Sequence, residues 1–265
     1  MTISTANIWT DSACLTDQVA IVTGGSGGIG RAICRVLSEA GCRVVVVGRD
    51  PGRVSATVET ASGSIGFAGC DVRSTSDMNR LFRFVDEEYN RLDIAIGCAG
   101  IGRSSDSGRR IPDPVVTLTT DDWNEVVETN LRGMFLLCRG AAQRMAQAKK
   151  GHILNISSAR AALHGQPCAA AYSASKMAVV AMCQSLAEEL SPLGVRVTSL
   201  LPDAVDTGLI SATRLATQGA MPPEAVAALV VELLASPADT SFQLPLLAPL
   251  GFNSAAREST TGAAT

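Results

Sequence analysis

Along most of the chain, short continuous apolar runs alternate with longer segments in which apolar positions recur every three or four residues. The runs that predict buried strands are Val19–Thr23, Val44–Val47, Ile65–Ala68, Ile94–Ile96, His152–Ile156 and Val195–Leu201. The segments with helical spacing lie around residues 28–40, 75–90, 122–147, 173–190 and 223–234. Continuous apolar strands that alternate with helices are typical of βαβ units. The pattern therefore predicts an α/β fold: a doubly wound parallel β-sheet with helices on both faces.

The segments outside this pattern set the expected boundaries. We expect an N-terminal tail over residues 1–16, one domain over 17–252 and a C-terminal tail over 253–265. The polar, Pro/Gly-rich stretch 102–114 reads as a surface loop. The late stretch "FQLPLLAPL" holds Pro245 and Pro249, and a strand with prolines suits the edge of a sheet better than its centre.

Composition narrows the class of protein. The chain has 265 residues, of which 46% are apolar and 18% charged, which is typical of a globular protein with one sizeable core. A net charge of −3 gives no basic surface for nucleic acid or an anionic membrane. No apolar run approaches the ~20 residues that span a bilayer, and the N-terminus lacks a signal pattern. We expect a soluble, cytoplasmic protein.

The cysteines and histidines argue against a metal centre. Eight cysteines are scattered without a C-x-x-C pair, and the chain has two histidines. Free thiols in a reducing compartment are the expected state, rather than a disulfide framework or a zinc site.

A glycine-rich turn follows the first predicted strand and opens a helix, in "VAIVTGGSGGIGRAICRVL". Gly24, Gly28 and Gly30 would allow a tight turn and close backbone approach to a pyrophosphate at the helix N-terminus. The second strand ends in "RVVVVGRD", with Gly48 where an acid for a ribose hydroxyl is expected and Arg49 after it. A guanidinium there favours NADP(H), although Asp50, one residue on, leaves NAD(H) open.

Tyr172 and Lys176 lie one helical turn apart and would project side by side on the stripe of a helix that faces the core. That stripe continues through Val179, Val180, Cys183, Ala187 and Leu190. A charge on a buried stripe is costly and therefore indicates an active site. The predicted strand "HILNISS" ends in Ser157 and Ser158, and one of them should face the cleft at the carboxyl end of the sheet.

The helix predicted over 122–147 begins at Thr119 or Thr120 and carries a polar residue within its apolar stripe. The apolar members of that stripe are Trp123, Val126, Val127, Leu131, Met134, Phe135 and Cys138. Asn130 falls in their midst, and a buried amide must find hydrogen-bond partners. Its pattern alone allows either a structural bond to backbone or a place in a polar network at a site.

Together these residues resemble the short-chain dehydrogenase/reductase family over about residues 17–240. The family's T-G-x-x-x-G-x-G corresponds to Thr23-Gly24-Gly25-Ser26-Gly27-Gly28-Ile29-Gly30, and its adenine-side acid to Asp71. Its catalytic asparagine, serine and Y-x-x-x-K correspond to Asn130, Ser158, Tyr172 and Lys176. The resemblance implies a Rossmann fold and cofactor contacts from Thr23, Gly24, Ser26, Gly28, Ile29, Gly30, Arg49, Asp71, Val72, Ala99, Gly100, Tyr172, Lys176, Pro202, Val205 and Thr207.

The resemblance also implies a mechanism. Tyrosine, with a pKa of about 10, is a weak base at neutral pH, and a neighbouring ammonium favours its phenolate. Tyr172 would exchange the proton of the substrate oxygen, and Lys176 would assist it and bind the nicotinamide ribose. Ser158 would hold the substrate oxygen, and Asn130 would place a water that relays protons.

Three departures from the family pattern stand out. The usual N-N-A-G is replaced by Gly97-Cys98-Ala99-Gly100, which puts the local hydrogen bonding in doubt. The P-G after the sixth strand is Pro202-Asp203, whose carboxylate would either disfavour the nicotinamide or contact a substrate group. The terminal D-G-G of many members is missing.

The expected activity is reduction of a small to medium carbonyl compound with NADP(H), a ketoreductase-type reaction with a biosynthetic role left open. The segment 206–224, with its single charge at Arg214, would form a lid suited to a mostly uncharged substrate. The alternatives are an NAD-dependent alcohol dehydrogenase of the same fold and a catalytically silent nucleotide-binding regulator. The resemblance further implies a homotetramer or homodimer through helices 122–147 and 173–190, with Met177, Ala181 and Met182 available for contact.

Overall fold

The computed structural model describes residues 15–102, 114–164, 167–207, 220–237 and 239–248. Residues 1–14 of the predicted N-terminal tail, the predicted C-terminal tail, most of the 102–114 loop and most of the predicted lid, with Arg214, lie outside the described residues. Leu15, which the sequence assigned to the tail, is instead buried in the core.

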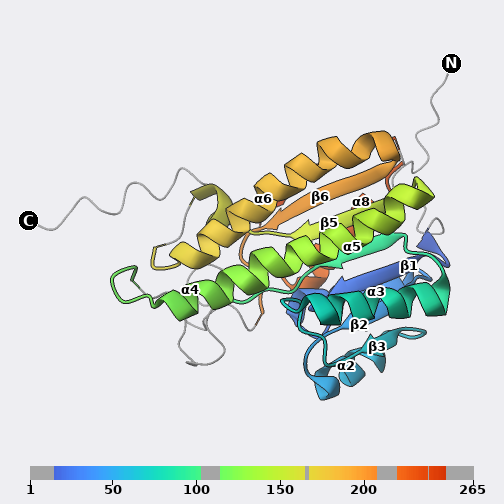
Figure 1. Ribbon diagram of the computed structural model, residues 1–265, viewed down its shortest axis with the longest axis horizontal. Helices are drawn as coiled ribbons and strands as arrows, with labels where there is room; N and C mark the ends of the chain where they lie inside the picture. Colours follow the sequence, from blue (N-terminus) through green and yellow to red (C-terminus); the bar gives the residue numbers. More distant parts are fainter. Residues whose placement is uncertain (1–14, 103–113, 165–166, 208–219, 238, 249–265) are drawn as a thin grey trace, which may run out of the picture.

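One parallel sheet forms the centre of the molecule (Figure 1). Its strands are β1 (Val19–Thr23), β2 (Arg43–Val47), β3 (Ile65–Phe67), β4 (Ile94–Gly97), β5 (Gly151–Ile156), β6 (Val195–Pro202) and β7 (Leu246–Leu247), in the order β3-β2-β1-β4-β5-β6-β7. The six strands predicted from continuous apolar runs are confirmed to within one residue at either end. The strand β7, which falls between Pro245 and Pro249 in the sequence, lies at an edge of the sheet, as expected.

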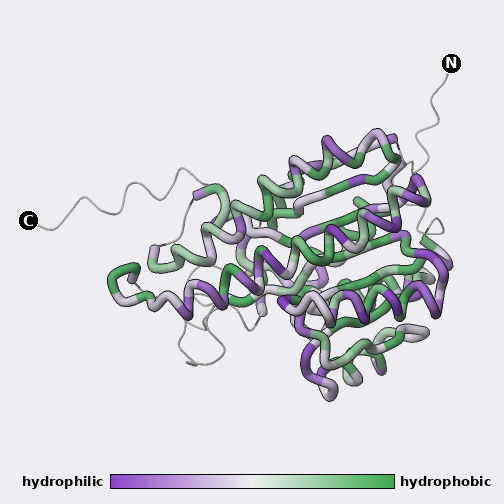
Figure 2. Tube along the Cα trace, viewed as in Figure 1, coloured by the Kyte–Doolittle hydropathy of each residue, from purple (hydrophilic) through white to green (hydrophobic). Residues whose placement is uncertain are grey.

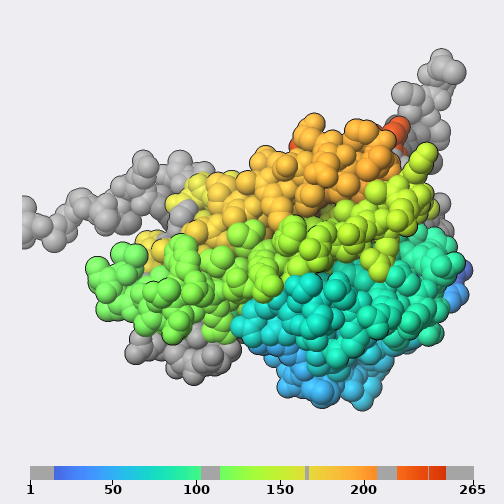
Figure 3. All heavy atoms as spheres, in the orientation of Figure 1, coloured from blue at the N-terminus to red at the C-terminus, as the bar shows by residue number. Residues whose placement is uncertain are grey.

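Helices cover both faces of the sheet, as the alternating pattern predicted. The helices are α1 (Gly28–Glu39), α2 (Pro51–Val58), α3 (Thr75–Tyr89), α4 (Thr120–Val127), α5 (Gly133–Ala148), α6 (Ala170–Leu190) and α8 (Pro223–Ala235). One core cluster joins α3, α5 and α6 to the face seen in Figure 3, and a second joins α1 and α8 to the opposite face. The strands between these layers are mostly hydrophobic (Figure 2). Within the described ranges, no helix is long and apolar enough to cross a membrane.

The short helix α2 was not predicted, because it is mostly exposed and buries little more than Val54 and Thr57. Its start is nevertheless marked in the sequence. Asp50 accepts a hydrogen bond from the main-chain N–H of Arg53 at 3.0 Å, and Pro51 takes the first helical position. Asp50 is therefore an N-cap residue.

The helix predicted over 122–147 is interrupted. Thr119 caps α4, as one of the two expected starts, but a π-helical turn, η2 (Glu128–Arg132), separates α4 from α5. A wider turn rotates the residues on its two sides relative to each other, so a single 3.6-residue stripe does not hold across it. The predicted stripe is consequently wrong for two side chains: Trp123 is 37% exposed and Phe135 is 45% exposed.

A histidine is buried in the sheet, away from the predicted site. His152 lies in β5, and its Nε2 is 2.9 Å from the Thr198 hydroxyl of β6. Burial, helped by the nearby positive charge of Arg196, lowers the pKa of His152 to about 3. The folded protein therefore keeps this imidazole neutral over a range in which an unfolded chain protonates it.

We expect this histidine to make stability pH-dependent. Because its folded pKa is depressed, its contribution is complete above the unfolded pKa of about 6.5 and is lost as the pH falls from there toward 3. The loss is about 1.4 kcal/mol of unfolding free energy per pH unit. His152→Gln should remove this part of the slope in urea unfolding at pH 7, 6 and 5. His164→Gln, which changes the other, exposed histidine, should retain it. Equal slopes in wild type and His152→Gln would contradict the assignment.

Candidate active site

The predicted site residues gather at the carboxyl edge of the sheet, toward which the strand arrows of Figure 1 point. The glycine turn follows β1, Ala99 and Gly100 follow β4, Ser158 follows β5, and Pro202 ends β6. In a doubly wound sheet this edge holds the ligand, at the point where the strand order changes direction. Here that point lies between β1 and β4, which are neighbours in the sheet.

The glycine turn is shaped for close packing and an anion. Gly24 has φ +66°, and a Cβ there would lie 2.7 Å from the main-chain nitrogen of Ala99. A Cβ on Gly30 would lie 2.3 Å from the Gly24 carbonyl oxygen. The N-cap residue of α1 is Gly27, which supplies no side-chain cap to the first-turn amides. Those amides and the helix dipole suit a pyrophosphate, so the turn fits a dinucleotide.

The segment after β6 reaches this turn. A Cβ on Gly28 would lie 2.6 Å from Cγ2 of Thr207, so these residues are in contact across the mouth of the cleft. Val205 is buried and forms a bridge with Met221, which holds the two ends of the predicted lid together. Thr207 is thus beside the glycine turn, although it lies far from it in the sequence.

The end of β2 has no room for the acidic side chain that would bind a ribose hydroxyl. A Cβ on Gly48 would lie 2.8 Å from the Ser26 hydroxyl oxygen and 2.9 Å from Cγ2 of Val54. Arg49 is exposed next to it, and its positive charge helps to lower the pKa of Asp71. Asp50, the residue that kept NAD(H) open, is engaged in capping α2.

Two arginines that sequence reasoning missed also reach this corner. The guanidinium of Arg53 donates to the Ser26 carbonyl oxygen at 3.1 Å, and that of Arg31 donates to the same oxygen at 3.5 Å. Both residues lie in the first turns of their helices, and the N-termini of α1 and α2 converge on the glycine turn. The sequence signal that could have identified them is their position in the first turn of a helix.

The predicted adenine-side acid is held in place by an ion pair. Asp71 accepts from the Arg73 guanidinium at 2.7 Å, and this bonding lowers the pKa of the Asp71 carboxyl. The main-chain N–H of Asp71 donates to Asp77 at 3.0 Å. The next residue, Val72, packs closely against Gly133. A Cβ on Gly133 would lie 2.7 Å from Cγ2 of Val72.

Lys176 is the buried charge of the site. Its side chain is 6% exposed, its Nζ donates to the Ile156 carbonyl oxygen at 2.8 Å, and it lies 5.7 Å from the ring centroid of Tyr172. Burial lowers the pKa of Lys176 to about 8, against an opposing effect of the Cys98 thiol. The rest of the predicted α6 stripe, from Val179 to Leu190, is buried as expected. The phenol ring and the ammonium therefore lie beside each other.

The two serines after β5 have different surroundings. Ser157 is buried, and its hydroxyl donates to the Lys176 carbonyl oxygen at 2.8 Å. Ser158 is half-buried, and its hydroxyl oxygen accepts from the Ala161 N–H at 3.4 Å. Ser157 is thus fixed to α6, and Ser158 is the serine that stays available to the cleft.

Asn130 lies in the π-helical turn and is fully buried. Its Oδ1 accepts from the Ile101 N–H at 2.8 Å, and its Nδ2 donates to the Ile101 carbonyl at 2.9 Å and to the Ser175 hydroxyl at 3.1 Å. The structural bond to backbone, one of the two alternatives, is therefore observed, and through Ser175 the amide also joins the loop after β4 to the helix that carries Tyr172.

The altered residues after β4 are explained by their neighbours. A Cβ on Gly97 would lie 2.0 Å from the Met134 sulfur and 2.3 Å from Oδ1 of Asn155. These two side chains fill the space that a longer side chain at position 97 would need. The Cys98 N–H donates to the Thr23 carbonyl oxygen at 3.1 Å, so the main chain beside the glycine turn keeps its bond to β1.

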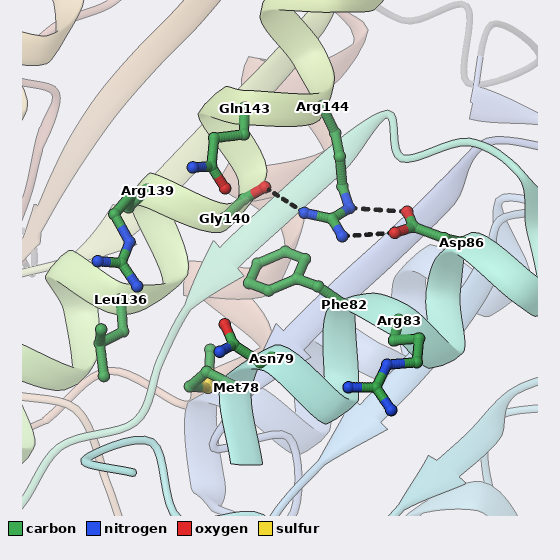
Figure 4. Close-up of a pocket in the computed structure, with 10 residues that line it drawn as sticks. All are labelled: Met78, Asn79, Phe82, Arg83, Asp86, Leu136, Arg139, Gly140, Gln143 and Arg144. Carbon is green, nitrogen blue, oxygen red and sulfur yellow. Dashed lines mark hydrogen bonds and ion pairs between the residues drawn. The ribbon is translucent and has the colours of Figure 1, made fainter. Parts of the chain in front are cut away.

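A separate cavity of about 400 Å³ lies between α3 and α5 (Figure 4). Arg144 of α5 pairs there with Asp86 of α3, and the ring of Phe82 lies beneath them. A Cβ on Gly140 would overlap that ring, so this glycine sets the spacing of the two helices. None of the predicted site residues lines the cavity, and it is not the candidate site.

Chemically, the edge of the sheet combines an anion-binding turn with a proton-transfer group. The turn and the guanidinium groups near Ser26 suit a phosphorylated dinucleotide. A phenol beside a buried ammonium, with a serine hydroxyl on the adjacent strand end, can exchange a proton with a carbonyl or alcohol oxygen.

Comparison with known proteins agrees with this geometry. The family model described as short chain dehydrogenase matches residues 18–218. An uncharacterized oxidoreductase of Staphylococcus aureus (strain N315) is 30% identical over 84% of this chain and 93% of its own length. A 3beta-hydroxysteroid dehydrogenase of Mediterraneibacter gnavus is 36% identical over 73% of this chain and 68% of its own.

A solved structure gives the same result. The crystal structure of a metagenomic short-chain oxidoreductase in complex with NADP superposes with a TM-score of 0.74, at 32% identity, over 89% of this chain and 98% of that one. The chain therefore belongs to the short-chain dehydrogenase/reductase family, the NAD(P)(H)-dependent oxidoreductases of Rossmann fold that act on CH–OH and C=O groups.

Proposed function

We propose that the protein reduces a small to medium carbonyl compound with NADPH and catalyses the reverse alcohol oxidation with NADP⁺. The observation that carries this proposal is the buried Lys176 ammonium, 5.7 Å from the Tyr172 ring centroid at the carboxyl edge of the sheet. The relative named as a hydroxysteroid dehydrogenase supports chemistry at a hydroxyl-bearing carbon.

The nicotinamide, when bound, supplies or accepts the hydride. Tyr172 donates a proton to the carbonyl oxygen during reduction and removes it during oxidation. Lys176 stabilises the phenolate by its charge, and Ser158 hydrogen-bonds the same substrate oxygen. Asn130 already uses both amide hydrogens and one lone pair of Oδ1, so a relay water must bind its other lone pair or its main-chain carbonyl.

Preference for NADP(H) is supported by the charges around Ser26. Arg49 is exposed beside it, and Arg31 and Arg53 both bond its carbonyl oxygen. Three guanidinium groups favour a 2′-phosphate, whereas Gly48 leaves no carboxylate to bind a free ribose hydroxyl. Asp50 caps α2, and this weakens the NAD-dependent alternative that rested on it.

We further propose a homodimer or homotetramer built through α4, α5 and α6. On these helices Trp123, Phe135 and Met177 are large apolar side chains exposed by 37%, 45% and 44%. Exposed apolar patches of this kind mark association surfaces. We also propose a cytoplasmic location, supported by the seven described cysteines, which are free thiols.

Tyr172→Phe should lower turnover by about a thousandfold, because general acid–base catalysis contributes on this order, while NADPH still binds. The control is Tyr89→Phe, which changes the other tyrosine of the chain, at the end of α3. The measurement is NADPH oxidation with a panel of ketones, together with nicotinamide fluorescence for binding. Undiminished turnover in Tyr172→Phe would exclude the assigned role.

Arg49→Ala should weaken NADPH binding by about ten- to a hundredfold, because a charge-assisted bond to phosphate is lost, and should leave NADH binding nearly unchanged. Fluorescence titration with both cofactors measures this. Arg35→Ala is the matched control, since Arg35 lies further along α1 and pairs with Glu39 at 3.0 Å. Tighter binding of NADH than NADPH by the wild type would overturn the preference.

Phe135→Asp should dissociate the proposed oligomer, because it places a charge on the apolar face. Sedimentation velocity at micromolar concentration should show a wild-type dimer or tetramer and a variant monomer. Leu193→Asp, at an exposed apolar residue just beyond α6, should leave the assembly intact. A monomeric wild type would refute the proposed assembly.

A further inference from the structure

Asp203 is a carboxylate without a hydrogen-bond partner for one of its oxygens. Its Oδ1 is buried and unbonded within the described residues, although the Asp203 N–H donates to the Leu247 carbonyl at 2.8 Å. It follows Pro202 at the carboxyl end of β6, where the resembled family has glycine. A buried carboxylate oxygen without a donor is costly, so its place at this edge calls for a ligand group.

The direction of the Asp203 side chain follows from strand geometry. Leu201 and Asp203 both donate their N–H groups to the chain around β7, so extended pairing continues through residue 203. Side chains two residues apart lie on the same face of a strand. Leu201 packs against Val180 of α6 and against Ala159 and Ala162, which places Asp203 on the face covered by α6.

The same geometry fixes which part of α6 it faces. The short turn η4 (Ser191–Leu193) joins α6 to β6, so the two elements run in opposite directions. Two residues of strand advance about 6.6 Å, which equals roughly four residues of helix. Leu201 faces Val180 of α6. Asp203, two residues further along the strand, therefore faces α6 about four residues before Val180. This count places Asp203 opposite the first turns of α6, which contain Ser173.

Ser173 provides a second, independent observation. Its hydroxyl oxygen is also buried and has no hydrogen-bond partner within the described part of the chain. Ser173 is two helical turns before Val180, and residues at i and i+7 lie on the same helix face. The hydroxyl thus belongs to the face of α6 that packs toward β6, as the Asp203 carboxylate belongs to the face of β6 that packs toward α6.

We propose that Asp203 and Ser173 form a subsite that binds a hydroxyl group of the substrate, next to the carbonyl that Tyr172 protonates. An ionised carboxylate only accepts hydrogen bonds, and the Ser173 hydroxyl has a hydrogen to donate. A substrate hydroxyl satisfies both, because it donates to Asp203 and accepts from Ser173. An ammonium has no lone pair for Ser173, and a substrate carboxylate is repelled by Asp203. The substrate class is therefore a hydroxyketone, an inference that rests on the proposed reductase function.

The test compares kcat/KM for cyclohexanone, the three ring isomers of hydroxycyclohexanone and oxocyclohexanecarboxylate, with NADPH as reductant. Wild type should prefer at least one hydroxyketone over cyclohexanone by about tenfold or more, as expected for a bond to a charged group, and should use the oxoacid least. Asp203→Ala should abolish the preference for the hydroxyketone and raise kcat/KM for the oxoacid. Ser173→Ala should reduce the preference in part.

Asp206→Ala is the matched control, because Asp206 is an exposed carboxylate three residues further along the same segment. It should keep the wild-type preference. An equal preference in wild type and Asp203→Ala, or no preference in wild type, would overturn the subsite.

A readout that does not need turnover separates this inference from the proposed function. Saturation-transfer NMR of the protein with NADP⁺ should show the cyclohexanediols binding more strongly than cyclohexanol, and Asp203→Ala should remove the difference. If no ketone oxidises NADPH but the diols bind in this Asp203-dependent way, the reductase proposal fails and the subsite stands. If turnover occurs and the diols show no Asp203-dependent binding, the subsite fails and the reductase proposal stands.

Discussion

A single buried lysine fixes the geometry on which the active site depends. An ammonium removed from water is costly unless it is hydrogen-bonded, and Lys176 meets this requirement through the Ile156 carbonyl at 2.8 Å. The main-chain carbonyl of Lys176 accepts a hydrogen bond at 2.8 Å from the hydroxyl of Ser157, the residue that follows Ile156. One residue of α6 is thus tied at both its side chain and its backbone to the end of β5. This double attachment fixes the helical turn that carries Tyr172 relative to the end of β5.

Asn130 attaches a third element to this pair. Its amide bonds both main-chain groups of Ile101, after β4, and the Ser175 hydroxyl on α6. Ser175 in turn donates to the Tyr172 carbonyl at 2.8 Å, so the network ends on the residue that carries the phenol. The π-helical turn around Asn130 accompanies this network, and such turns occur frequently at functional sites. Rigid placement of the phenol therefore depends on the ends of β4 and β5 and on the π-helical turn, not on α6 alone.

These features also separate what the sequence could predict from what it could not. Strands buried on both faces are continuous apolar runs, so β1 to β6 were predicted closely, and the Tyr172–Lys176 spacing was sufficient to place a charge on a buried stripe. The exposed Trp123 and Phe135 were misassigned, because nothing in a 3.6-residue pattern reveals a π-helical turn. The convergence of Arg31 and Arg53 on Ser26 is a tertiary contact between two helix starts, and no sequence spacing contains it.

The departures from the family pattern differ in whether the fold compensates for them. At Gly97 the volume of the missing side chain is filled by Met134 and Asn155, although the buried Oδ1 of Asn155 has no hydrogen-bond partner within the described residues. At Asp203 the chain gains a carboxylate, and within the described residues no donor meets its buried Oδ1. Packing can redistribute volume among neighbours, but an unpaired charge is relieved only by a donor. An unpaired amide oxygen costs less than an unpaired carboxylate oxygen, so Asp203 is the stronger indication of a group supplied from outside the chain. Differences in specificity from other members of the family are therefore to be sought at Asp203 before Gly97.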